Sequence, residues 1–267
     1  MTGVIFRETL RRSWRGMLML GGSMAAMGLY IVLILNDPAM VDIFQTKLGA
    51  MQPILNLMGG GDAAFMATPE GMINYGYFSW MILILTGYAL WVGMSVTSAE
   101  EDRGIMDSLL AVPVARWQVV VEKLAAYTLV MAVAVLIGHL GLVLPLGASK
   151  VFSGVSTARL LESSINMLPT AVLVMAFSAW IAVVVRRRNT AMIIAVAFLV
   201  ASYFVDFIGR SVPEVDGLRR VSVFAYYDSV EVMKNGLLWG NLAVIVGVGA
   251  LLAAGTVFLF RRRDVGV

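Results

Sequence analysis

The chain has 267 residues, of which 60% are hydrophobic and 14% charged, and its formal net charge is +3. Soluble domains contain roughly 45–50% apolar and about 25% charged residues, so this composition excludes a soluble domain and predicts an integral membrane protein. The chain has no cysteine and one histidine, which excludes disulfides, thiolate or histidine-rich metal sites and cysteine nucleophiles.

Six apolar stretches are each about 20 residues long, which is enough for a helix to cross a bilayer. The sequence therefore predicts an all-α integral membrane protein, with six transmembrane helices in a single domain over residues 1–267. The predicted spans are residues 17–36, 73–96, 124–147, 165–185, 191–209 and 242–260. Six spans place the two termini on the same side of the membrane, and 13 of the 20 Lys and Arg residues fall in segments on that side. By the positive-inside rule, we expect both termini in the cytoplasm.

The N-terminal segment, residues 1–16, has the pattern of an amphipathic helix that lies at the membrane surface. Three large apolar side chains fall within one arc of the helical wheel, and arginines lie beside them. Anchoring to anionic lipid is one role for such a helix, and bracing a cytoplasmic partner is another compatible with it. The predicted interfacial residues are Phe6, Arg7, Leu10, Arg11, Trp14 and Arg15.

Before the second span, "TPEG" at residues 68–71 has the features of a helix start: a Thr cap, a Pro at the first helical position and an acid in the first turn. The span itself begins with a group of aromatic residues. Such a group is typical of packing or of an interfacial belt, and lining of a transport pathway is the alternative. These candidate pathway residues are Tyr75, Tyr77, Phe78 and Trp80. The 18 methionines would also suit an adaptable apolar pocket.

The segment between the second and third spans, residues 100–123, combines both charge signs with a short apolar face. Ile105, Met106, Leu109 and Leu110 recur at helical spacing. Gly104 precedes this stretch and Pro113 ends it, and a second helix is expected to run on into the third span. Exposed apolar residues rimmed by charge indicate a protein contact. A helix tucked against the membrane surface is the alternative, and the residues alone leave both open. For Lys123, snorkelling to the interface and a part in this contact also remain open.

His139 lies within the third span, where ionisable residues are functional candidates by default. A neutral histidine that hydrogen-bonds within the bundle is the alternative. Near the outer end of the fifth span, we expect Asp206 to be solvated at the interface. Residues 210–240 are too polar to span, and Phe224, Tyr226, Tyr227 and Trp239 suit short helices at the outer leaflet.

The order of residues in the segment between the second and third spans, residues 100–123, resembles the cytoplasmic motif of one transporter family. The motif here reads Glu100, Glu101, Gly104, Ile105, Asp107, Leu109, Leu110, Pro113, Arg116 and Lys123. It is similar to that of the permease subunit of ATP-binding cassette (ABC) transporters of the type-2 (exporter, type V) group, in which Thr often stands at the place of Ile105. "TPEG", "FAYYDSVEVMKNG" and "FLFRRRD" are also similar to members of that family, so the resemblance covers essentially the whole chain.

The resemblance implies that the segment forms a coupling helix, seated in a groove of a separate ATPase subunit. Two permease chains, identical or related, and two ATPase chains would form the working unit, in contact with membrane lipids and not with nucleic acid. The implied ATPase-coupling residues are Glu100, Glu101, Gly104, Met106, Asp107, Leu109, Leu110, Pro113 and Arg116.

The chain itself is then expected to bind no cofactor and to be no enzyme, with ATP and Mg²⁺ held by the partner. This agrees with the lack of a GxxxxGK[ST] phosphate-binding loop in the sequence. The expected location is a bacterial plasma (inner) membrane. Alternatives are a secondary transporter, a non-transporting immunity or sensor protein, and an intramembrane enzyme built on His139 and a serine such as Ser79, Ser178 or Ser202.

Overall fold

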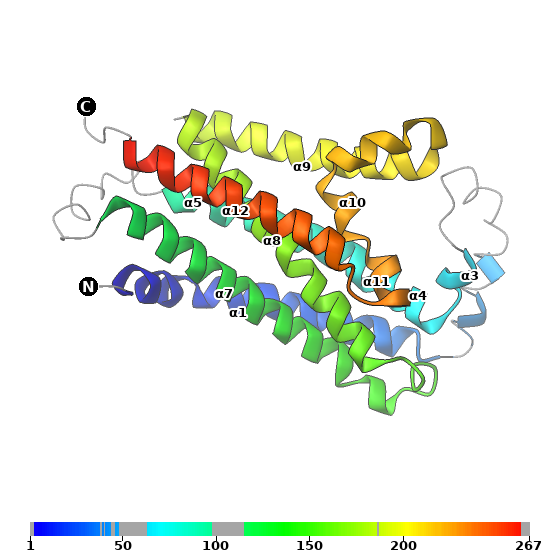
Figure 1. Ribbon diagram of the computed structural model, residues 1–267. Helices are drawn as coiled ribbons and strands as arrows, with labels where there is room; N and C mark the ends of the chain where they lie inside the picture. Colours follow the sequence, from blue (N-terminus) through cyan, green and yellow to red (C-terminus); the bar gives the residue numbers. More distant parts are fainter. Residues whose placement is uncertain are drawn as a thin grey trace.

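The structure is a computed structural model that describes residues 3–37, 39, 41–43, 46–47, 63–97, 115–185 and 187–262. Those residues form long helices that run roughly alongside one another, with shorter helices at one end (Figure 1). The long helices are α1 (Val4–Ile34), α5 (Ser79–Thr97), α7 (Arg116–Val143), α8 (Thr157–Val185), α9 (Arg188–Ser211) and α12 (Trp239–Arg262). The short elements are α3 (Ala63–Met66), α4 (Pro69–Ile73), η1 (Asn74–Phe78), η2 (Leu146–Ala148), η3 (Pro213–Val221), α10 (Val223–Tyr227) and α11 (Ser229–Asn235).

Six helical stretches of the described chain are long and apolar enough to cross a membrane, which confirms the six predicted spans. Their bounds are Val4–Ile34, Pro69–Thr97, Trp117–Ala148, Thr157–Val185, Arg188–Arg210 and Trp239–Arg261. Most extend beyond the predicted limits, because hydropathy marks the apolar centre of a helix and not its polar turns. The largest difference is at α1, where the predicted interfacial helix and first span form one continuous helix.

The start of α1, the end of α12 and the turn between α8 and α9 lie at one end of the bundle (Figure 1). The same end carries the last residue of α5 and the first residue of α7, on either side of residues 98–114. The helices therefore bring the Arg-rich segments of the sequence to a common end, as the alternation of charge predicts.

Helices α1 and α7 pack with their backbones in close approach. A Cβ atom on Gly141 of α7 would lie 2.4 Å from the Cα of Ala25, and one on Gly28 of α1 would lie 3.0 Å from the Cα of Leu142. Glycine at these positions is what allows the two helices to come so close. The approach is repeated along the pair, so α1 and α7 form one closely packed unit.

Helices α5 and α8 form a second close pair. A Cβ atom on Gly93 would lie 2.4 Å from the carbonyl oxygen of Met175. The hydroxyl of Ser178 also donates a hydrogen bond of 2.6 Å to the carbonyl of Leu90. Both contacts join backbone of one helix to the other helix, and this leaves little room for the pair to slide.

The short helices between α9 and α12 confirm the predicted helical character of residues 210–240, but two of their aromatic residues are placed otherwise. Phe224 and Tyr227 are 4% and 5% exposed and belong to the core, not to an interfacial belt. They are buried because α10 and α11 fold back against α8 and α9. Trp239, in contrast, is exposed.

Polar contacts tie the end of α9 to η3 and α10. The carboxylate of Asp206 accepts hydrogen bonds from the Nε of Arg210 at 2.9 Å and the Nε of Arg219 at 3.1 Å. The Ser222 hydroxyl donates to the carbonyl of Ser202 at 2.7 Å. Asp206 is therefore a paired carboxylate and not merely a solvated one.

Candidate functional site

Most of the predicted coupling segment lies outside the described residues: Glu100, Glu101, Gly104, Met106, Asp107, Leu109, Leu110 and Pro113 fall there, and so does the side chain of Arg116. The helices on both sides of it are described. Helix α5 ends at Thr97, and α7 begins at Arg116 after Ala115. The predicted restart of a helix after Pro113 is thus confirmed.

The first turn of α7 is closed by its own residues. Ala115 has an extended backbone, and its N–H donates to the side-chain oxygen of Gln118 at 3.2 Å. Such a bond from the N-cap position to the side chain three residues later is half of a capping box. It satisfies a donor at the point where the chain leaves segment 98–114 and starts the helix.

One and a half turns into α7, the carboxylate of Glu122 caps a different helix. It accepts hydrogen bonds from the backbone N–H groups of Gly3 at 2.8 Å, Ile5 at 3.0 Å and Phe6 at 3.0 Å. Gly3 has a φ of 92°, a left-handed conformation that glycine adopts without steric cost. The four N–H groups at a helix start need partners, and a negative charge there is favourable. Glu122 thus fixes the start of α1 to α7.

The next residue, Lys123, points to a third helix. Its ammonium donates to the carbonyl of Val96 at 3.2 Å, and the residue is 5% exposed. Snorkelling of Lys123 to the interface is therefore wrong: the side chain is enclosed by protein. Val96 is the second-last residue of α5, where carbonyl groups lack partners within the helix and a positive charge is favourable.

The amphipathic half of α1 meets the protein through a narrow face. Ile5 and Thr9 are buried, whereas Phe6 and Leu10 are half-buried and Trp14 is 48% exposed. The predicted apolar arc thus lies beside the packed face and stays accessible, as contact with lipid requires. Of the predicted basic residues, Arg7, Arg11 and Arg15 are exposed, and Arg11 pairs with Glu8 at 3.1 Å.

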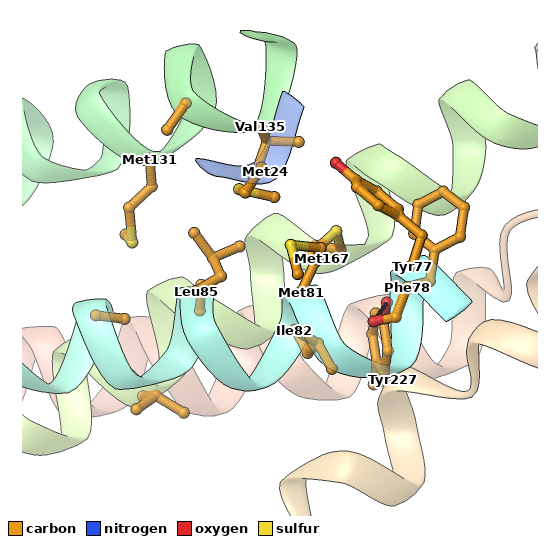
Figure 2. Close-up of a cluster of buried hydrophobic side chains, with 14 of the residues drawn as sticks. Met24, Tyr77, Phe78, Met81, Ile82, Leu85, Met131, Val135, Met167 and Tyr227 are labelled. Atoms are coloured by element: carbon orange, nitrogen blue, oxygen red, sulfur yellow. Dashed lines mark hydrogen bonds between the residues drawn. The ribbon is translucent and has the colours of Figure 1, made fainter. Parts of the chain in front are cut away.

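The four aromatic pathway candidates do not share one environment. Tyr77 and Phe78 are buried at one end of a cluster rich in methionine (Figure 2). Tyr75 is half-buried and Trp80 is 60% exposed. Tyr77 and Phe78 are therefore core residues within this chain, and Trp80 and Tyr75 are the two that reach its surface.

Two buried hydrogen bonds connect this aromatic group to α8 and α10. The Asn166 side chain of α8 donates to the carbonyl of Tyr227, and the Tyr227 hydroxyl donates to the carbonyl of Phe78 at 3.3 Å. Burial raises the pKa of Tyr227, so the phenol keeps its proton as a donor. Phe78 ends the π-helix η1, a wide turn often found at functional sites. Within this turn, both polar side-chain atoms of Asn74 are buried without a partner among the described residues.

His139 has a serine neighbour that the sequence did not single out. Its Nδ1 lies 3.0 Å from the Oγ of Ser164, which also donates to the carbonyl of Leu160 at 2.8 Å. The hydroxyl has one proton and two acceptors within reach, the carbonyl of Leu160 and the ring nitrogen, and the tautomer of His139 decides which of them receives it. The pair joins α7 to α8 by a hydrogen bond with either tautomer. In the described ranges, no three His, Asp or Glu side chains are grouped to hold a metal ion.

The model of the family described as "ABC-2 family transporter protein" matches residues 25–265, which is nearly the whole chain. The matched range begins within α1 and ends after α12, so it includes the last part of α1 and all of the other long helices. No curated protein matches the chain.

Proposed function

This chain belongs to the ABC-2 transporter family, and on that premise we propose that it is the permease subunit of an ATP-driven exporter, coupled to a separate ATPase. Two permease chains and two ATPase subunits make the working unit. The ATPase subunits hold ATP and Mg²⁺, and they sit at the end of the bundle that carries both termini. That end faces the cytoplasm of a bacterial cell, and the amphipathic first half of α1 lies there at the level of the membrane surface.

The observation that carries this proposal is the base of segment 98–114. The segment joins α5 to α7 at the basic end of the bundle, and the residues just inside it are anchored to α5 and α1 by Lys123 and Glu122. A loop that receives a push from a partner subunit must be tied to the helices that it moves, and these two anchors supply such a tie.

In this mechanism, ATP closes the ATPase dimer and displaces the coupling helix. Met106, Leu109 and Leu110 form its apolar knob, with Glu100, Glu101, Asp107 and Arg116 in polar contact around it. The displacement passes to α5 and α7 and changes which side of the membrane the cavity between the two permease chains faces. Trp80 and Tyr75, on the surface of the second span, are the aromatic candidates for that cavity.

Co-purification tests the proposal. The chain is tagged at its C-terminus, extracted from native membranes in mild detergent, and its partners are identified by mass spectrometry. We expect an ATPase with a phosphate-binding loop at one copy per permease. A chain without such a partner, from membranes whose other complexes stay intact, would instead favour a secondary transporter or an immunity or sensor protein.

A further inference from the structure

Segment 98–114 connects two different structural units of the bundle. It leaves α5, which packs closely with α8 around Gly93, and it enters α7, which packs closely with α1 around Gly141. Interlocked backbones make each pair resist internal shear. Movement driven through the segment must therefore act mainly between the pairs, α1–α7 and α5–α8.

Two consecutive residues of α7 lie where such movement would be received. Glu122 contacts α1 within its own pair, and Lys123 contacts α5 across the boundary between the pairs. Neighbouring positions on a helix are about 100° apart, so one turn of α7 can contact α1 through Glu122 and α5 through Lys123. Each charge also has the sign favoured by the helix end that it meets.

The bond from Lys123 to Val96 contributes to the packing of α7 against α5. Lys123 is 5% exposed, and a hydrogen bond from a buried charged group contributes more to stability than one between neutral groups. The carbonyl of Val96 lies next to the last residue of α5, at the root of the segment. The bond thus joins the end of α5 to α7 at a point about two helical turns after the start of α7.

We infer that Lys123 is a positioning residue that makes the end of α5 and the start of α7 move together under the coupling segment, and that Glu122 passes this movement to α1. The role in ATP coupling rests on the proposed function. The connection of α5 to α7 through Lys123 and Val96, called the joint below, rests on the hydrogen bond alone. Without Lys123, displacement of the segment would spread the two roots apart and would be lost before it reached the bundle.

Lys123→Met tests the role in coupling, because methionine keeps most of the side-chain length and removes the charge. In the purified complex with its ATPase, we expect the variant to retain the ATPase subunit while the permease-dependent ATPase rate falls at least about fivefold. Lys123→Arg should restore part of the rate. Lys150→Met, which removes an exposed lysine from the turn between α7 and α8, is the matched control and should leave the rate unchanged. A wild-type rate in Lys123→Met would overturn the inference.

A second measurement tests the joint without any ATPase. The chain has no cysteine, so spin labels attach only where cysteines are introduced. One labelled pair, at the exposed residues Trp91 of α5 and Val121 of α7, reports on the boundary between units; the control pair, Leu18 of α1 and Leu129 of α7, lies within one unit. We expect Lys123→Met to broaden the first distance distribution and leave the second unchanged.

The two measurements separate the possible failures. Broadening together with a wild-type chain that binds no ATPase would refute the proposed function and leave the joint standing. An unchanged first distance would refute the joint, whatever the ATPase does. If Lys123→Met does not fold, Glu122→Gln, at a half-buried position, takes its place. We expect the Glu122→Gln complex to keep its ATPase subunit and to have a lower permease-dependent ATPase rate. A spin label at position 7, where Arg7 is exposed, should become more mobile. A wild-type ATPase rate together with wild-type label mobility would overturn the inference.

Discussion

Leu110→Asp is expected to remove the ATPase subunit from the purified complex. Leu110 lies in the predicted apolar knob of the coupling helix, outside the described residues, and the proposal seats it in a groove of the partner. An aspartate there would carry an unpaired charge into an apolar contact. Loss of a central interface residue costs about 2–4 kcal/mol, which weakens binding roughly 30- to 1,000-fold. The amount of ATPase recovered with the tagged permease measures the effect.

Leu218→Asp is the matched control. Leu218 is a leucine that is 56% exposed, and it lies in η3 at the opposite end of the bundle. We expect this variant to recover as much ATPase as the wild type. Equal recovery with Leu110→Asp would contradict the placement of the ATPase on segment 98–114.

Gly141→Ala is expected to destabilise the folded chain more than a single methyl group ordinarily does. The new Cβ would lie 2.4 Å from both the Cα and the Cβ of Ala25, and backbone on the two sides cannot yield independently. Overpacking of this kind costs about 1–3 kcal/mol. In a chain of this size, that corresponds to a fall of roughly 2–10 °C in the midpoint of thermal unfolding, measured in detergent or nanodiscs.

Gly22→Ala provides the comparison within the same helix pair. Gly22 lies on α1, where a Cβ would meet no atom within 4 Å. The same chemical change there should leave the midpoint unchanged or raise it slightly, because alanine favours helix more than glycine does. Equal midpoints for the two variants would show that α1 and α7 are not packed as closely as described.

Hydropathy and charge were enough to predict the spans, because both act over about 20 residues and tolerate local error. The Thr68 cap was also predictable: its side chain accepts the N–H of Gly71 at 3.1 Å, as "TPEG" indicated. The resemblance to ABC-2 permeases is confirmed by the family match over residues 25–265. The spans, the Thr68 cap and the family motif were predictable because each depends on residues that are close together in the sequence or on the order in which residues follow one another.

The environments of individual side chains could not be predicted, because they depend on which helices become neighbours. Lys123 near a span end has the pattern of a snorkelling anchor, and only the position of α5 reveals that Val96 encloses its charge. Glu122 has no partner nearby in the sequence, since the N–H groups that it caps are more than 110 residues away. The burial of Tyr77 and Phe78 likewise follows from packing against α1, α7 and α10.

The central claim is that the coupling segment is the seat of the ATPase, and site-specific crosslinking in living cells tests it most directly. A photoreactive amino acid is placed at Leu110 in one variant and, as a control, at Trp239, which is 74% exposed at the start of α12. The account predicts a crosslinked product with an ATPase subunit from position 110 and none from position 239. A product from 239, or no ATPase in the product from 110, would contradict it.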